Sequence, residues 1–220
     1  MLNQNMETFK ESIKRRTLED MPNEVLLKIF SYLDTEEILK CAQTSKRMNE
    51  ICKDKSLWQR QKVSLENHII DYKIINQFFL LNEKPPIFLN LSNCKGLELW
   101  CIQDIVKSCL NLVELNLELT NLSPDSLNFL ANNLTSTIRR LSLKKLKNIE
   151  DKHIKRLVRR CSKLTVIDLS YCTSITKTSL ICIVNNLMHS LEELDLTATS
   201  IKISDIQILK EQIPNLSIKF

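Results

Sequence analysis

Leu115-Asn116-Leu117 is one copy of a phrase that the chain repeats at nearly constant intervals. The other copies are Leu89-Asn90-Leu91, Leu141-Ser142-Leu143, Ile167-Asp168-Leu169 and Leu194-Asp195-Leu196. Successive copies begin 26 residues apart, and 27 apart at the last step. One step earlier, Val63-Ser64-Leu65 fits the same pattern. A fixed period of this length indicates a solenoid, in which each unit packs only on its neighbours and the array offers an extended surface to another protein.

The segments between these phrases carry helix signals. Ser123 is a favoured N-cap, and Pro124 and Asp125 suit a first helical turn. We expect helices over 125–132, 151–160 and 178–187, a last helix capped by Ser204, and strands over 87–92, 113–118, 139–144, 165–170 and 192–197. Each strand leads through a helix to a parallel strand. The sequence therefore predicts an α/β solenoid, with a curved parallel sheet on its concave face and helices on its convex face.

The segment before the repeats has a different character. We expect a flexible lead-in over residues 1–16, a helical domain over 17–60, a linker with an irregular first repeat over 61–85, and the repeat array over 86–220. The first predicted helix, Pro22 to Leu33, has one broad apolar face. Asp34 and Glu37 have the spacing of a capping box and predict the start of the second helix. Another helix is expected from Ile69 to Leu81.

Composition excludes several classes of function. The 220 residues carry 31 basic and 26 acidic side chains, a mixed surface of net charge +5, and no aromatic stripe is placed for base stacking. Gly96 is the only glycine, so glycine-rich phosphate loops are excluded. No run of 18 apolar residues occurs, and the first ten residues lack the apolar core of a secretory signal. We expect no nucleic acid, membrane or cofactor as a ligand.

The eight cysteines follow the repeat register. Cys94 and Cys172 lie 78 residues apart, which is three periods, and Cys109 and Cys161 lie 52 apart, which is two. Equivalent positions stack at the same level of successive units, so the pattern predicts buried, reduced thiols in a cytoplasmic or nuclear protein. The cysteines and histidines lack metal-ligand spacing, so no metal site is expected. Cys161 and His153, eight residues apart, leave a thiol hydrolase as an alternative.

The helical segment closely resembles an F-box. Leu18 to Trp58 begins Leu-Glu-Asp-Met-Pro-Asn-Glu-Val-Leu-Leu-Lys-Ile-Phe-Ser-Tyr-Leu and ends Ser-Leu-Trp. The family usually has leucine at the position of Met21, a change that conserves volume. Leu164 to Cys172 resembles the cysteine-containing leucine-rich repeat. The two modules in this order resemble the F-box/leucine-rich-repeat proteins.

That resemblance implies a non-catalytic substrate receptor. In the family, the F-box docks on the adaptor subunit of SCF-type cullin–RING ubiquitin ligases, the repeats hold a protein substrate, and other subunits transfer ubiquitin. The partners implied are the adaptor, the cullin and a substrate. The implied adaptor contacts are Leu18, Pro22, Leu26, Ile29, Phe30, Leu33, Leu39 and Trp58. An F-box scaffold acting outside a ubiquitin ligase stays open as an alternative.

Residues between the repeated leucines are expected to point outward on the concave face and to bind the substrate. They are Asn90, Glu114, Asn116, Glu118, Arg140, Ser142, Lys144, Asp168, Ser170, Glu193 and Asp195. Their charge runs acidic, basic, acidic along the array, which would steer a partner with the complementary order. A merely solvated face is the alternative interpretation.

Two positions depart from the repeat. Leu146 stands where other repeats have Cys or Thr, so its turn is expected to differ. The last phrase, Leu216-Ser217-Ile218, begins only 22 residues after Leu194, and no polar capping unit follows it. A bare solenoid end invites pairing, so either the sequence is a fragment or an accessory protein covers this C-terminal edge.

Overall fold

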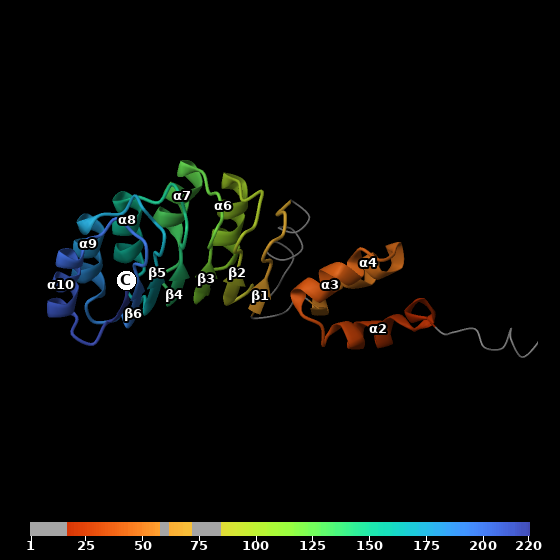
Figure 1. Cartoon of the computed structure of the whole chain (residues 1–220). Helices are drawn as coiled ribbons and strands as arrows, with labels where there is room; N and C mark the ends of the chain where they lie inside the picture. Colours follow the sequence, from red (N-terminus) through yellow and green to blue (C-terminus); the bar gives the residue numbers. More distant parts are fainter. Residues whose placement is uncertain (1–16, 58–61, 72–84) are drawn as a thin grey trace, which may run out of the picture. The chain divides into compact units, whose positions relative to one another are not determined.

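The computed structural model describes residues 17–57, 62–71 and 85–220. The chain divides into two compact units between Leu57 and Trp58. Figure 1 shows that the first unit consists of short helices and that strands and helices alternate in the second. The two units are described separately below.

The first unit contains helices and short 3-10 turns only. They are η1 (Leu18–Asp20), α2 (Asn23–Phe30), α3 (Thr35–Ala42), α4 (Lys46–Cys52) and η2 (Lys55–Leu57). The predicted capping box is confirmed, because Glu37 N donates to Asp34 Oδ1 and Asp34 N donates to Glu37 Oε2, both at 2.8 Å. The predicted helix 22–33 is too long: Pro22 is the N-cap of α2, and the helix ends at Phe30 because Asp34 must become extended to cap α3.

Packing and one arginine hold these helices together. The core side chains of the unit are Leu26, Phe30, Ile38, Met48, Ile51, Cys52 and Leu57. The Arg47 guanidinium, on α4, donates to the carbonyls of Glu19 and Met21 and, at 2.9 Å, to Asn23 Oδ1. These bonds satisfy carbonyls just before α2 and fix where that helix begins.

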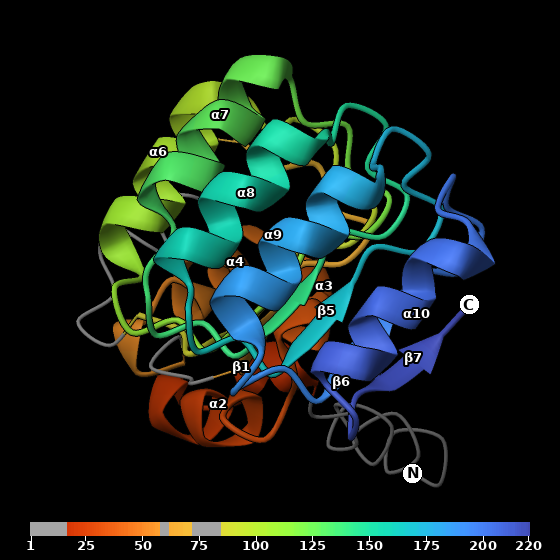
Figure 2. The same ribbon diagram turned by 90° about the vertical axis from the view of Figure 1, so that its left-hand side faces the viewer.

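The second unit confirms the predicted α/β repeat fold. It runs β1 (Lys62–Ser64), β2 (Phe88–Asn90), α6 (Leu99–Ser108), β3 (Glu114–Asn116), α7 (Pro124–Asn133), β4 (Arg140–Ser142), α8 (Asp151–Arg160), β5 (Val166–Asp168), α9 (Lys177–Leu187), β6 (Glu193–Asp195), α10 (Ile203–Gln212) and β7 (Ser217–Lys219). The seven strands form one parallel sheet in chain order. Equivalent apolar residues are direct register partners, as Leu115 and Leu141 are. Figures 1 and 2 show the helices stacked along one side of this sheet.

Four details differ from the sequence predictions. The strands are three residues long rather than six, because the chain turns directly after the second leucine of each phrase. Helix α6 was implied by the repeat but its bounds were not predicted, since its N-cap Glu98 makes no side-chain capping bond. Helix α10 begins at Ile203 with Lys202 as N-cap, so Ser204 lies inside the helix and does not cap it. Ile69 pairs with Lys95 in a bridge rather than starting a helix, and 72–81 lie outside the described residues.

The turn after each strand uses a left-handed residue without glycine. The positions are Asn67, Asn93, Leu119, Lys145, Tyr171 and Ala198, with φ between 53° and 63°. Each turn closes through the next residue, as Cys172 N donates to Leu169 O at 3.1 Å. Leu146 N donates to Leu143 O at the same 3.1 Å, so the prediction of a different turn there is wrong. The backbone makes this turn, and the side chain at that position is not required for it.

All eight cysteines lie in the described residues, and none forms a disulfide. The four cysteines predicted to stack are buried, as expected. Cys94 Sγ donates to Leu65 O at 2.8 Å and Cys172 Sγ to Leu143 O at 3.1 Å, each reaching the preceding repeat. Thiols at this position therefore connect successive turns of the solenoid. Cys41 and Cys182 are only partly buried.

Candidate functional site

The first candidate surface is the outer side of α2. Along this helix, Leu26 and Phe30 point into the core, and Val25 and Ile29 follow a neighbouring stripe one residue earlier. Val25 is exposed and Tyr32, just after the helix, is 76% exposed. Lys28 Nζ lies over the Tyr32 ring at 5.1 Å from its centroid. Exposed apolar side chains gathered on so small a unit make this side of α2 a candidate protein-interaction surface.

The implied adaptor contacts separate into two groups. Leu26 is 0% exposed and Phe30 is also buried, so both belong to the core, and their predicted direct contact is corrected to a supporting role. Leu18 and Pro22 are exposed, and Ile29, Leu33 and Leu39 are half-buried. Trp58 lies outside the described residues. Val25 and Tyr32 were absent from the predicted set, although the helical spacing 25, 29, 32 could have identified them.

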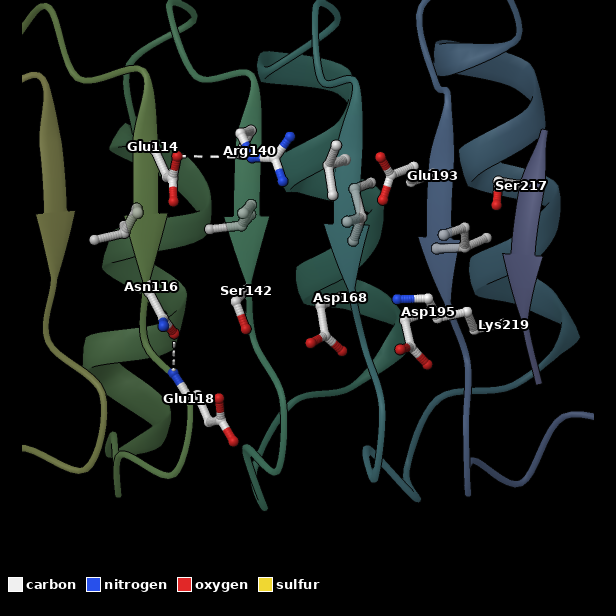
Figure 3. Close-up of a pocket in the computed structure, with 15 residues that line it drawn as sticks. Glu114, Asn116, Glu118, Arg140, Ser142, Asp168, Glu193, Asp195, Ser217 and Lys219 are labelled. Atoms are coloured by element: carbon white, nitrogen blue, oxygen red, sulfur yellow. Dashed lines mark hydrogen bonds and ion pairs between the residues drawn. The ribbon is translucent and has the colours of Figure 1, made fainter. Parts of the chain in front are cut away.

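The second candidate surface is the open face of the sheet, meaning the side turned away from the helices. A hollow of about 290 Å³ lies on this face across β3 to β7. Figure 3 shows its polar side chains rising from neighbouring strands. Most of the predicted substrate-binding residues line it, namely Glu114, Asn116, Glu118, Arg140, Ser142, Asp168, Glu193 and Asp195. Asn90 and Lys144 lie on the same face but do not line the hollow.

The ends of the hollow were predicted less well. Ser217 and Lys219 of β7 line it, but the short interval before the last phrase kept them out of the predicted set. Ser170 is 3% exposed, and its Oγ donates to Asp168 Oδ1 at 2.6 Å. The prediction that Ser170 contacts a substrate is therefore corrected: it supports Asp168.

The central polar column also has a structural role. Asn90, Asn116, Asp168 and Asp195 each accept, through Oδ1, the backbone N–H two residues later, at 2.9–3.0 Å. Such Asx turns start the bend that ends the strand. The side chains are therefore held in fixed orientations, and Asn116, Asp168 and Asp195 among them line the hollow.

Ion pairs change the electrostatic character of the open face. Arg140 Nε lies 3.6 Å from Glu114 Oε2, and Lys144 Nζ lies 2.8 Å from Glu118 Oε1. The hydrogen bond to Glu118 raises the pKa of Lys144. The two bases predicted as a separate basic block are thus each paired with an acid of the preceding repeat. Among described residues, Asp168, Glu193 and Asp195 form no ion pair, and Lys219 stands across from Asp195 on β7.

The surroundings of Cys161 and His153 argue against the thiol-hydrolase alternative. Burial raises the pKa of Cys161 to about 11, the opposite of what an activated nucleophile needs. Its Sγ points to Thr135 O at 3.5 Å, while His153 Nδ1 accepts from Glu150 N at 3.0 Å. Within the described ranges, no group of three or more acidic, His or Cys side chains is arranged to hold a metal ion. Among those same residues, no helix combines the length and apolarity that a membrane crossing needs.

A comparison with known protein families matches the segment that contains the first candidate surface. Residues 18–64 match the F-box-like family, a span that begins at η1 and ends with β1. The match includes the exposed stripe of α2, its buried counterpart and the capping box at Asp34. This chain therefore carries an F-box-like domain, followed by an α/β repeat array.

Proposed function

We propose that this protein is the substrate-recognition subunit of an SCF-type ubiquitin ligase, non-catalytic itself. The observation that carries the proposal is the F-box-like match at residues 18–64 together with the exposed apolar stripe inside it. F-box domains bind the adaptor of cullin–RING ligases, so the stripe has a natural partner. The repeat array then supplies a separate surface for the substrate.

The adaptor-binding residues in this proposal are those of the family resemblance, extended by the exposed residues of α2 and the turn after it. They are Leu18, Pro22, Val25, Ile29, Tyr32 and Leu33, with Leu39 and Trp58 retained from the family resemblance. Leu26 and Phe30 of the same helix are buried in the core and hold α2 in position. Burying an exposed leucine or valine side chain contributes roughly 1.5–3 kcal/mol, so each exposed apolar residue of the stripe would add to the stability of a complex.

In this proposal the open face of the sheet binds the substrate. Its supporting features are the hollow of about 290 Å³, polar groups with fixed orientations, and more carboxylates than bases in the lining. Solenoids use such extended faces for partner binding. The partly buried and buried thiols fit the reducing cytosol or nucleus, where ubiquitin ligases of this type act.

The test is co-purification of the full chain with adaptor, cullin and RING subunit. A single assembly containing the cullin supports the ligase-receptor function. A stable complex with the adaptor that excludes the cullin would instead favour a scaffold acting outside a ligase. The matched pair of variants is Val25→Asp with Tyr32→Asp, against Gln43→Asp with Asn49→Asp, which changes two exposed polar residues at the α3–α4 end of the unit. Only the first pair should prevent assembly.

A further inference from the structure

The left-handed positions that follow the strands form a column along the rim of the open face, here called the rim column: Asn67, Asn93, Leu119, Lys145, Tyr171 and Ala198. Asparagine and glycine tolerate this backbone best, and a bulky side chain there is an outlier. Leu119 and Tyr171 nevertheless occupy it, and they are 45% and 49% exposed. Neither the backbone nor the core explains these two residues.

The two bulky rim residues each follow a strand whose side chains line the hollow. Tyr171 follows Asp168, which lines the hollow, by three residues, and Leu119 follows Asn116, another lining residue, by three. Lys145 stands between them in the column, with its Nζ 4.9 Å from the centroid of the Tyr171 ring. Leu119 N donates to Lys144 O at 3.0 Å and Lys145 N to Ser170 O at 2.9 Å, so these turns are direct neighbours. Leu119 and Tyr171 are thus two strand spacings apart, roughly 10 Å.

Lys145 stands in the rim column itself, but acidic side chains outnumber basic ones in the hollow beside it. Arg140 already forms an ion pair with Glu114, and Lys144 forms one with Glu118. Asp168 and Asp195 project from neighbouring strands into the hollow, as Figure 3 shows, and Glu193 lies above them on the same face. A partner that approaches here meets apolar surface on the rim and, in the hollow, five carboxylates (Glu114, Glu118, Asp168, Glu193 and Asp195) against the two bases Arg140 and Lys219.

We propose that Leu119 and Tyr171 hold an apolar part of an extended, basic substrate segment, whose Lys or Arg side chains bind Asp168 and Asp195. This inference rests on the proposed function, because it assumes that the open face receives the substrate. Two rim contacts about 10 Å apart match residues i and i+3 of an extended chain in the polyproline II conformation, which rises about 3.1 Å per residue and returns its side chains to the same side every third residue. The expected segment therefore carries apolar residues three apart, with basic residues among or beside them.

Asparagine substitution separates this role from a structural one. Leu119→Asn and Tyr171→Asn place a favoured residue in the left-handed turn, so the melting temperature stays unchanged or rises by up to about 4 °C. Binding of the segment weakens by about tenfold in each, since an anchor side chain is lost. Ala198→Asn is the matched control, because it makes the same backbone change at an exposed rim position without a bulky side chain, and it leaves binding unchanged.

The charge contribution has an equally conservative test. Asn90 and Asn116 form the same Asx turn as Asp168 and Asp195. Asp168→Asn with Asp195→Asn therefore keeps the turns and removes two charges. We expect about tenfold weaker binding and a smaller dependence of affinity on salt.

The probe is a random 12-residue peptide display library, selected on the full chain in complex with the adaptor, with selected peptides remade as fluorescent probes. Enrichment of basic peptides with apolar residues three apart, whose binding responds to the variants as stated, supports the inference. Selection of acidic or neutral peptides, selection of none, or binding insensitive to Leu119→Asn and Tyr171→Asn overturns it. The adaptor complex used as bait is assayed separately, so failure of peptide recognition is distinct from failure of the proposed ligase role.

Discussion

Asp151 accepts a hydrogen bond from the backbone N–H of Thr176 at 2.8 Å, which ties the first turn of α8 to the N-cap of α9 in the next repeat. The Thr176 and Ser179 hydroxyls donate to the same carboxylate at 2.6 and 2.5 Å. Burial alone would raise the pKa of Asp151, but the hydrogen bonds from Ser179 and Thr176 outweigh it and hold the pKa below its usual value. One carboxylate thus accepts three hydrogen bonds from the next repeat, in addition to the bond from Cys172 Sγ to Leu143 O that joins the same two repeats.

Asp151→Ala is expected to lower the free energy of unfolding by about 1–3 kcal/mol, because three donors lose their acceptor. Urea unfolding measures this change. Asp125→Ala is the control, since Asp125 is an exposed first-turn acid of α7, and its loss should cost only about 0.3–1 kcal/mol. Equal effects of the two substitutions would contradict the inter-repeat role. Because the folded pKa of Asp151 is lowered, its contribution is present above the usual carboxyl pKa and is lost as pH falls through the folded pKa.

His153 predicts a second, separate pH dependence. It is 1% exposed, and its Nε2 has no hydrogen-bond partner among the described residues. Burial, with Lys152 nearby, lowers its pKa below 6.5. The unfolded chain then binds the proton more readily, so stability falls as pH drops below about 6.5 towards the folded pKa. His153→Leu should flatten the dependence of unfolding free energy on pH in this window, whereas His189→Gln, at an exposed site, should not. An unchanged slope in His153→Leu would show that another group titrates there.

The single glycine is expected to be irreplaceable. Gly96 has φ +77°, and a Cβ there would stand 2.6 Å from the Ile70 carbonyl oxygen. Gly96→Ala therefore combines left-handed strain with a backbone clash and should destabilise the repeat unit by at least about 2 kcal/mol. Thermal unfolding checks this expectation. A melting temperature equal to that of the wild type would mean that the Ile70 segment can move aside.

The thiols should divide into two reactivity classes. Burial raises the pKa of Cys94 and Cys172 to about 11 and that of Cys109 to about 12. We expect a thiol reagent such as DTNB at pH 8 to label only the partly buried Cys41 and Cys182 in the native protein. The other six should react only after unfolding in guanidinium. Rapid labelling of Cys161 in the native state would revive a catalytic role for it.

The repeat predicted the fold because its period fixes the register. Leucines 26 residues apart, such as Leu115 and Leu141, can all be buried only if every strand stacks in phase, which places the outward residues on one face. The pairing of Glu114 with Arg140 follows from the same interval. The left-handed turns were not predicted, because hydrogen bonds between backbone groups impose them on Leu119, Lys145 and Tyr171, which carry no turn signal.

Helix α2 shows why the direction in which side chains point is harder to predict than the presence of a helix. Val25, Leu26, Ile29 and Phe30 are all apolar, so the pattern locates α2 but does not distinguish the buried stripe from the exposed one. Only the packing of α3 and α4 decides that Leu26 points inward. The Asx turns at Asp168 and Asp195 were missed for a related reason: a polar residue between two leucines indicates exposure but not its hydrogen bonds.

The most direct test of the central claim is the affinity of the full chain for the adaptor subunit, measured by isothermal titration calorimetry. Val25→Asp with Tyr32→Asp should weaken the wild-type affinity at least about a hundredfold, because two exposed anchors become charged. Circular dichroism and melting temperature should stay those of the wild type, since neither side chain is in the core. Wild-type affinity in this folded double variant, or no adaptor binding by the folded wild type, would contradict the account.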